Sequence, residues 1–226
     1  KPIVKNNNNN IHVALLYGGV SRERPVSLLS FDIFNEALRN LGYIVTPVDV
    51  GHDLVNVIAT VESDVIVNGL YGTQGEDGYI PALLDMLGLK YTHSGVVPSM
   101  LGFDKTLAYK VFKTHGIRFA NNKIISKKDG LKKDPMRRPY VIKPISEGSS
   151  FGVQLVFEED DFDFANYEWK YGDTVIVEEY IPGKELQVAV LDGKAVGIMD
   201  IIPLKRDFYD YDSKYKKGFA EHIVPA

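Results

Sequence analysis

The segment "VIKPISEGSSFGVQLV", residues 141–156, places a lysine, three serines and two glycines between two apolar runs. Backbone amides in a glycine–serine turn can bind phosphate oxygens, and so can a lysine ammonium. The segment therefore allows two interpretations: an ordinary β-hairpin turn, or a flexible flap that holds a phosphate together with Lys143. Taken alone, its composition favours the ordinary turn, so the rest of the chain has to decide between them.

Residues on either side of this segment supply the other groups that a nucleotide needs. Lys105 lies before it in "FDKTLAYK", and "VIVEEYIPGKE" follows it with Glu178 and Glu185. An extended backbone offers adenine a donor and an acceptor, a carboxylate accepts from ribose hydroxyls, and two lysines offset phosphate charge. This combination favours a nucleotide site over a plain turn.

Two more glycine-rich loops follow apolar runs in the first half of the chain. "YGGVSRE" lacks the later glycines of G-x-G-x-x-G, and the sequence has no P-loop pattern G-x-x-x-x-G-K-[ST]. A tight strand-to-helix turn is the simpler explanation for it. "YGTQGEDGY" follows a strand, where open α/β sheets bind their ligands, although a plain connector explains it equally well.

Strand and helix patterns alternate through the first hundred residues. The expected strands cover residues 11–19, 43–50 and 63–70, and the expected helices cover 27–42, 54–61 and 79–88. The polar lead-in at 1–10 is expected to be poorly ordered. This alternation predicts an open parallel sheet covered by helices over residues 11–98.

From Ser99 the pattern changes to α+β. One helix is expected over 99–116, followed by strands at 123–125, 140–144, 153–157 and 174–181. These elements predict a second domain over 99–182. Two further strands about an Asp192–Gly193 turn, and then an aromatic, charged loop over 205–226, are typical of the opening of a third domain over 183–226.

Composition excludes several classes of protein. The 226 residues are 45% hydrophobic and 25% charged with a net charge of −4, so the sequence predicts no nucleic-acid or membrane partner. The chain has no cysteine, which excludes disulfides and thiolate metal sites and suits the cytoplasm. No apolar run reaches the roughly 18 residues of a membrane helix. The scattered histidines, which lack metal-ligand spacing and are expected to be structural, are His12, His52, His93, His115 and His222.

Six motifs in order resemble those of the ATP-grasp enzymes, and in particular the D-alanine–D-alanine ligases. They are "YGGVSRERPVSLLS", "GTQGEDGYIPALLDMLGLKYTHSGV", "FDKTLAYK", "VIKPISEGSSFGV", "VIVEEYIPGKELQVAVL" and "DFYDYDSKY". The resemblance implies an α/β protein with a Rossmann-like pre-ATP-grasp substrate domain at 11–98. It implies an α+β ATP-grasp nucleotide domain at 99–182 and an incomplete C-terminal ATP-grasp domain at 183–226.

The resemblance also implies an activity. In this family ATP phosphorylates the carboxylate of one D-alanine, and the amine of a second D-alanine attacks the acyl phosphate. The product, D-alanyl-D-alanine, serves peptidoglycan precursor synthesis. The implied cofactors are ATP and Mg²⁺ or Mn²⁺. The implied partners are D-alanine, ATP and a second copy of the chain that binds through the N-terminal domain, and the implied location is the cytoplasm.

Nucleotide-binding roles carry over by match of motif. The resemblance assigns the phosphates to Lys105 and Lys143, the flap to Glu147, Gly148, Ser149 and Ser150, the adenine side to Glu178, Glu179, Tyr180 and Ile181, and the ribose to Glu185. The metal ligands of the family, and an arginine near the transferred phosphate, are expected beyond Ala226. The chain as printed is therefore expected to be an incomplete catalyst.

The resemblance assigns the first D-alanine to a second group of residues. Glu23 would hold its ammonium, with Val26, Ser27 and Tyr71 nearby, and Ser149, Lys214 and Tyr215 would close the site in catalysis. The alternatives without a functional role are a glutamate in the first turn of a helix for Glu23 and a solvated surface loop for "YDYDSKYKK". Three residues depart from the family pattern: Tyr71, Pro25 and His93.

Two other functions stay open. One is an ATP-grasp ligase that joins a different pair of amino acids. The other is a fragment that binds nucleotide or dimerises without catalysis.

Overall fold

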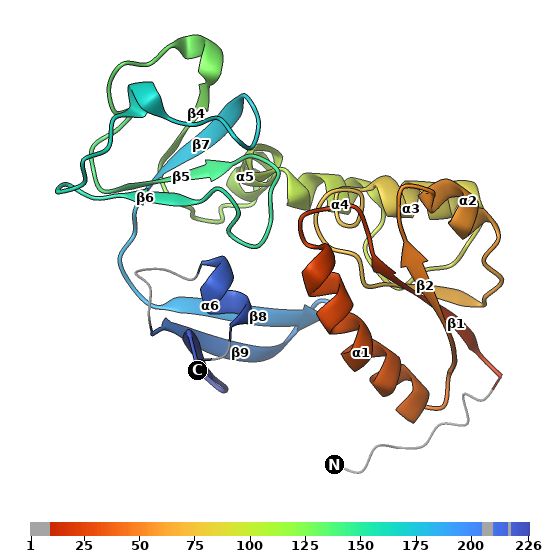
Figure 1. Cartoon of the computed structure of the whole chain (residues 1–226). Helices are drawn as coiled ribbons and strands as arrows, with labels where there is room; N and C mark the ends of the chain where they lie inside the picture. The colour runs from red at the N-terminus through yellow and green to blue at the C-terminus, as the bar shows by residue number, and fades with distance from the viewer. Residues whose placement is uncertain (1–9, 205–209, 217) are drawn as a thin grey trace. The chain divides into compact units, whose positions relative to one another are not determined.

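The protein is described here by a computed structural model, in which residues 10–204, 210–216 and 218–226 are placed (Figure 1). The lead-in expected to be poorly ordered therefore lies almost wholly outside the described residues. The chain divides into two compact units at the boundary between Val111 and Phe112. Each unit is described by itself. The domain limits expected near residues 99 and 183 stay predictions.

The first unit contains the expected parallel sheet. Its strands are β1 (His12–Gly18), β2 (Ile44–Val50) and β3 (Val65–Asn68), in the order β2-β1-β3. Its helices are α1 (Arg24–Asn40), α2 (Leu54–Ala59), α3 (Tyr79–Met86) and α4 (Val96–Phe103). The alternation of strands and helices predicted from the sequence is confirmed. No helix among the described residues is long and apolar enough to cross a membrane.

Burial of the apolar side chains of the central strand β1 stabilises this sheet. Its residues from Val13 to Leu16 are at most 1% exposed, as expected for a strand covered on both faces. Ala14 and Leu16 pack with Ile58 of α2 and Leu84 of α3. The carboxyl ends of β1 and β3 consequently lie side by side at one edge of the sheet, which fixes where the two glycine-rich loops begin.

The prediction of a single helix over residues 99–116 is wrong. The chain breaks at Asp104, whose backbone is extended with ψ of 110°, and α5 (Lys105–Thr114) starts after it. The Asp104 carboxylate accepts hydrogen bonds from the amides of Thr106 and Leu107 at 2.8 and 3.0 Å. An aspartate in this position satisfies the free amides of a helix start, so it begins a new helix.

The second unit holds an antiparallel sheet in the order β4-β7-β5-β6. The strands are β4 (Asn122–Ser126), β5 (Tyr140–Pro144), β6 (Gln154–Val156) and β7 (Thr174–Glu179), with short 3₁₀ turns η1 (Lys127–Asp129) and η2 (Phe164–Asn166). All four strands were expected from the sequence, although β7 ends two residues earlier than the predicted Ile181.

The two faces of this sheet differ in chemistry. Tyr140 and Ile142 of β5 and Val177 of β7 are fully buried in one apolar cluster. Because side chains alternate along a strand, Lys143 of β5 and Glu178 of β7 belong to the opposite face. The strand register, with Ile142 beside Val177, agrees with this division. One face is therefore a core, and the other presents charged groups.

A second antiparallel sheet follows, in the order β10-β9-β8. Its strands are β8 (Glu185–Leu191), β9 (Lys194–Pro203) and β10 (Ala220–Ile223). The first two strands join at the predicted turn, where Asp192 and Gly193 have φ of 49° and 71°, the geometry of a type I′ hairpin. Every residue of β8 is exposed.

The loop expected over residues 205–226 is wrong in its described part. Besides β10, it contains the short helix α6 (Tyr211–Tyr215). Asp210 starts that helix, because its carboxylate accepts from the Ser213 amide at 2.8 Å and its carbonyl accepts from the Lys214 amide at 3.0 Å. Residues 205–209 and 217 of the expected loop lie outside the described part of the chain.

Candidate functional site

The two glycine-rich loops of the first unit meet at the carboxyl edge of its sheet. The Ser21 hydroxyl donates to the Tyr71 carbonyl at 2.6 Å and accepts from the Glu23 amide at 3.1 Å. One side chain thus ties the loop after β1 to the loop after β3. Open parallel sheets bind ligands at this edge.

Glu23 lies at this junction. It directly precedes α1, accepts from the amides of Val26 and Ser27 through its carbonyl, and is 4% exposed. A Cβ atom added to Gly72 would lie 2.6 Å from Glu23 Oε2, and Gly72 has φ of +69°. Only glycine therefore leaves room for the carboxylate where the two loops touch.

A second carboxylate, which the sequence analysis did not single out, belongs to the same junction. Glu76 Oε2 accepts from the Gly72 amide at 2.7 Å. Burial raises the pKa of Glu76, the hydrogen bond from Gly72 lowers it, and the negative charges of Glu23 and Asp77 raise it, leaving it above the usual value. The junction is thus acidic, which suits a cation. The signal in the sequence was the acidic pair within "GEDG".

The remaining residues predicted to bind substrate have internal roles in this unit. The Ser27 hydroxyl is fully buried, donates to the Gly69 carbonyl at 2.5 Å and accepts from the Gly18 amide at 2.9 Å. The Tyr71 hydroxyl lies 3.1 Å from Ser30 Oγ. Val26 is 5% exposed. Direct contacts of these residues with a substrate stay predictions.

In the second unit, the charged face of the four-stranded sheet carries an ion pair. Lys143 Nζ lies 2.5 Å from Glu178 Oε2, and the side chain of Glu178 is only 5% exposed. A lysine held by a buried carboxylate on a neighbouring strand has a fixed position, so its ammonium is aimed before any ligand arrives. The two residues predicted to serve the phosphates and the adenine side are thus brought together.

Two more predicted residues join this pair electrostatically. Although Glu185 is exposed by surface area, partial loss of hydration raises the pKa of its carboxylate, the positive charges of Lys214 and Lys143 lower it, and the net shift is upward. Lys214 comes from α6 and Glu185 begins β8. The charge cluster of the second unit, Lys143, Glu178, Glu185 and Lys214, therefore draws on both of its sheets and on α6.

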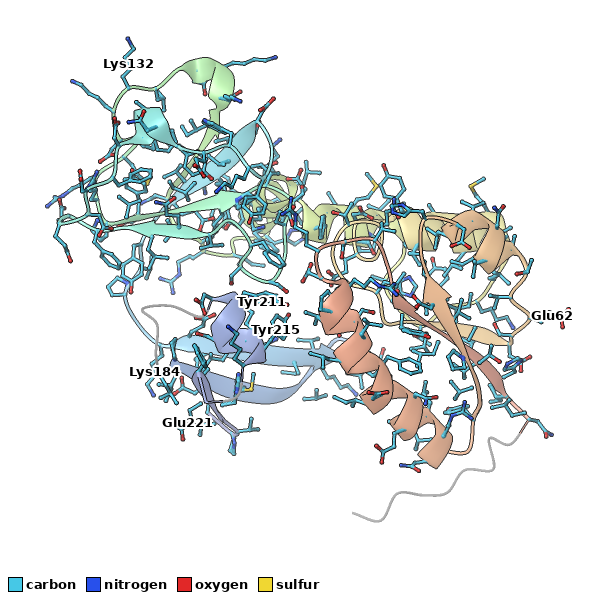
Figure 2. The ribbon with its side chains drawn as sticks, viewed as in Figure 1. Glu62, Lys132, Lys184, Tyr211, Tyr215 and Glu221 are labelled. Carbon is cyan, nitrogen blue, oxygen red and sulfur yellow. The ribbon has the colours of Figure 1, made fainter. Side chains whose placement is uncertain are left out.

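The glycine–serine segment is the connection between β5 and β6, and its tip contacts α6. Ser149 and Ser150 have φ of 47° and 60°, the left-handed region that L residues seldom adopt. The Ser149 hydroxyl lies 2.8 Å from the Tyr215 hydroxyl, and Phe151 packs on Tyr211 with ring centroids 5.0 Å apart. Both tyrosines come from α6 (Figure 2). We call residues 148–152 the flap.

The predicted adenine side comprises the last two residues of β7, Glu178 and Glu179, and the two residues after the strand, Tyr180 and Ile181. The Glu179 amide donates to the Asn121 carbonyl at 2.8 Å, and the Tyr180 amide donates to the Pro139 carbonyl at 3.2 Å. These two donors are already used by the fold. Ile181 lies beyond the strand and is 65% exposed. A contact of the Ile181 backbone with adenine stays a prediction.

Some predicted roles are not addressed by either unit alone. Lys105 is the first residue of α5 in the first unit, so its phosphate contact stays a prediction, as does the link from Glu23 to Ser149 and Tyr215. Glu147 and Gly148 lie at the start of the flap connection. Among the described residues, no group of three or more histidine, aspartate or glutamate side chains could hold a metal ion.

Comparison with known proteins gives consistent results. The family described as "D-ala D-ala ligase C-terminus" matches residues 105–226. D-alanine--D-alanine ligase of Rickettsia bellii (strain OSU 85-389) is 52% identical over 215 residues, which cover 95% of this chain and 67% of that protein. The Rickettsia canadensis (strain McKiel) enzyme of the same name is also 52% identical, and the match covers 95% of this chain and 61% of that enzyme.

A solved structure supports the same relationship. The crystal structure of D-alanine--D-alanine ligase from Bacillus anthracis superposes with a TM-score of 0.76 at 25% identity. The match covers 96% of this chain and 72% of that one. The present chain thus spans about two thirds of the length of its relatives.

Proposed function

Because the chain belongs to the D-alanine–D-alanine ligase family, we propose that it serves the ATP-dependent joining of two D-alanines into D-alanyl-D-alanine for peptidoglycan precursors. The observation that carries this proposal is the arrangement in the second unit. There the Lys143–Glu178 pair, Glu185 and Lys214 form one charge cluster, and Ser149 contacts Tyr215. Cations bind the phosphates of a nucleoside triphosphate, carboxylates bind its ribose hydroxyls, and a flap that closes covers it.

We propose that the second unit binds ATP on the charged face of its four-stranded sheet. Lys143 takes the phosphates, and Glu178 holds the Lys143 ammonium in place at 2.5 Å. Glu185 accepts from the ribose hydroxyls, and the backbone at Ile181 meets the adenine edge. Lys214, which already lowers the pKa of Glu185, adds a second positive charge near the phosphates.

We further propose that the acidic junction of the first unit binds the ammonium of the first D-alanine. Glu23 is almost fully buried and Glu76 adds a second negative charge, so a cation there gains more than it would in water. Ser21 holds the two loops in register for that contact. Val26, Ser27 and Tyr71 shape the walls of the same junction.

The finer architecture is part of this proposal. The proposed domains are a pre-ATP-grasp domain at 11–98, an ATP-grasp domain at 99–182 and the start of a C-terminal domain at 183–226, and Lys105 is proposed to bind a phosphate. Dimerisation through the first domain, a divalent metal held by ligands beyond Ala226, and a cytoplasmic location complete the picture. Flap closure would exclude water from the acyl phosphate, which water would otherwise hydrolyse.

The identity of the dipeptide product tests the proposed function. Because the 226-residue chain is expected to be an incomplete catalyst, it is compared with longer versions of it. Each is incubated with ATP, D-alanine and an equal amount of D-serine, and dipeptides are identified by mass spectrometry. D-alanyl-D-alanine as the main product, lost in Glu23→Gln, supports the proposal. A mixed dipeptide would instead indicate a ligase for another amino-acid pair. ATP binding without any dipeptide, in the 226-residue chain and in longer versions of it, would indicate a nucleotide-binding fragment.

A further inference from the structure

A cavity of about 550 Å³ in the second unit has no part in the proposed function. It lies between β6 and the segment that follows η2. Its lining includes Gly152, Gln154, Asn166, Tyr167 and Tyr171. A volume of this size is within the usual range for small-molecule sites.

The cavity belongs to the face of the sheet opposite the charge cluster. Gln154 pairs with Ile142 across β5 and β6, and directly paired residues share a face. Ile142 is fully buried in the apolar core, whereas Lys143 is on the charged face. A molecule in this cavity would therefore be separated by the sheet from a nucleotide beside Lys143.

The walls of the cavity combine aromatic rings with amide groups. Tyr167 stacks on Phe164 with ring centroids 5.6 Å apart, and Tyr171 lines another part of the wall. Gln154, whose side chain carries an amide, also lines the cavity. Glu168 and Lys170, at the rim, form an ion pair and cancel each other's charge. Such walls match a ring face, a hydrogen-bonding edge and no net charge.

We propose that this cavity is a second ligand site for a neutral, planar aromatic molecule with an amide-like hydrogen-bonding edge. The ring packs against Tyr167 and Tyr171, and the edge pairs with the Gln154 amide. Burial raises the pKa of Tyr167, with a further contribution from Tyr171, so the Tyr167 hydroxyl stays protonated and can donate.

The same site is positioned to act on the flap. Gly152, the last flap residue, has φ of +70°, and a Cβ there would lie 2.5 Å from Tyr171 Cδ2 and 2.7 Å from Pro144 Cγ. The Tyr171 ring therefore lies close to Gly152, near the end of β5, and leaves no room there for a side chain. A ligand that fixes Tyr171 restricts Gly152, and so restricts the segment that carries Ser149.

Benzamide is a suitable probe, with cyclohexanecarboxamide as the matched control that keeps the amide and loses the planar ring. Binding is followed by saturation-transfer NMR and by emission of Trp169, the sole tryptophan, whose ring lies 5.1 Å from that of Tyr167. Benzamide is expected to bind and cyclohexanecarboxamide to bind at least severalfold more weakly. Equal binding of the two amides would overturn the proposal, and so would displacement of benzamide by ATP.

Two variants locate the amide contact. Gln154→Ala is expected to weaken benzamide about fivefold, the usual effect of losing one hydrogen bond. Gln187→Ala, in the exposed strand β8 of the same unit, is expected to leave binding unchanged. Equal effects of the two variants, or none from Gln154→Ala, would refute the assigned site.

Amide hydrogen exchange tests the coupling to the flap without any use of the ligase reaction. Saturating benzamide is expected to slow exchange severalfold at residues 148–152 and to leave β8 unchanged. Binding that protects only residues 162–171 would refute the coupling. This readout does not depend on the proposed function, so the two proposals can fail separately.

Discussion

The glycine-rich loops of the first unit and the flap of the second each follow a β-strand. They differ in the hydrogen bonds that hold them. In the first unit, the Gln74 amide donates to Asp77 at 2.8 Å, and the Asn68 side chain donates to the Gly75 carbonyl at 2.9 Å. The Ser21 and Glu76 contacts add to these. Side chains thus satisfy the backbone of these loops from several directions.

The flap has two backbone hydrogen bonds within its own turn. The Phe151 amide donates to the Gly148 carbonyl at 3.0 Å, and the Val153 amide to the Ser150 carbonyl at 3.2 Å. Its outward contacts include the Ser149–Tyr215 hydroxyl pair, which joins two exposed or half-buried groups. This difference is what we expect if, as proposed, the first unit holds a pre-formed cation site and the flap is a movable cover.

The largest effect is expected for Gly72→Ala. Its new Cβ would meet Glu23 Oε2 at 2.6 Å, so the free energy of unfolding should fall by about 2–4 kcal/mol through steric overlap and backbone strain. Gly88→Ala is the matched control, because Gly88 has nearly the same φ of +68° with no atom within 4 Å. Chemical denaturation measures both. Equal losses would mean that the junction is not tightly packed.

A smaller loss is expected for Ser21→Ala, which removes the hydroxyl that ties the two loops together. Two hydrogen bonds are lost, at 2.6 and 3.1 Å, so the free energy of unfolding should fall by about 1–2 kcal/mol. Ser99→Ala, which loses one exposed bond of 3.3 Å to Ser94, should cost less than half as much. A neutral Ser21→Ala would show that the loops are held by other contacts.

Tyr215→Phe should barely change stability, by less than about 0.5 kcal/mol, because it removes one hydroxyl contact at the protein surface. Its effect should instead be local, with severalfold faster amide exchange at residues 148–152. Exchange at the loop of residues 72–78 serves as the internal reference. A flap that exchanges at the same rate in both proteins would contradict the view that Tyr215 holds it.

The smallest effect concerns pH and Glu76. Its folded-state pKa is raised, so its favourable contribution is present below its unfolded pKa near 4.5 and is lost as pH rises through the folded value. Glu76→Gln removes this dependence. The stability of the variant relative to the wild type should therefore rise between pH 4 and pH 7, by less than about 0.5 kcal/mol. A relative stability that falls over this range would mean that Glu76 gains from ionisation.

Much of the fold was predictable because strong local signals agree with the tertiary structure. The apolar run before Gly18 and the turn at Asp192–Gly193 each specify one geometry. The helix break at Asp104 and the helix after Asp210 do not follow from apolar spacing, because the start of each helix is set by a capping aspartate. In both places an aspartate accepts from amides two or three residues further on.

The site was predictable to a different extent. Motif matches located Lys143, Glu178 and Glu185, which the structure brings into one cluster. They did not indicate that Ser27 is fully buried or that Glu76 joins Glu23, because those facts depend on how two loops distant in sequence pack together. Local patterns carry no information on such packing.

The most direct test of the central claim is the affinity for ATP, measured by calorimetry, of Lys143→Ala. The account predicts a loss of about 1.5–3 kcal/mol, or about 10- to 150-fold, because a charged hydrogen bond to phosphate disappears. Lys128→Ala, an exposed lysine of the same unit, should bind as the wild type does. The double variant Lys143→Met/Glu178→Gln removes both charges of the ion pair. Neither charge is then left without its partner, so this variant is expected to fold. Unchanged affinity in folded Lys143 variants would contradict the assignment of the ATP site.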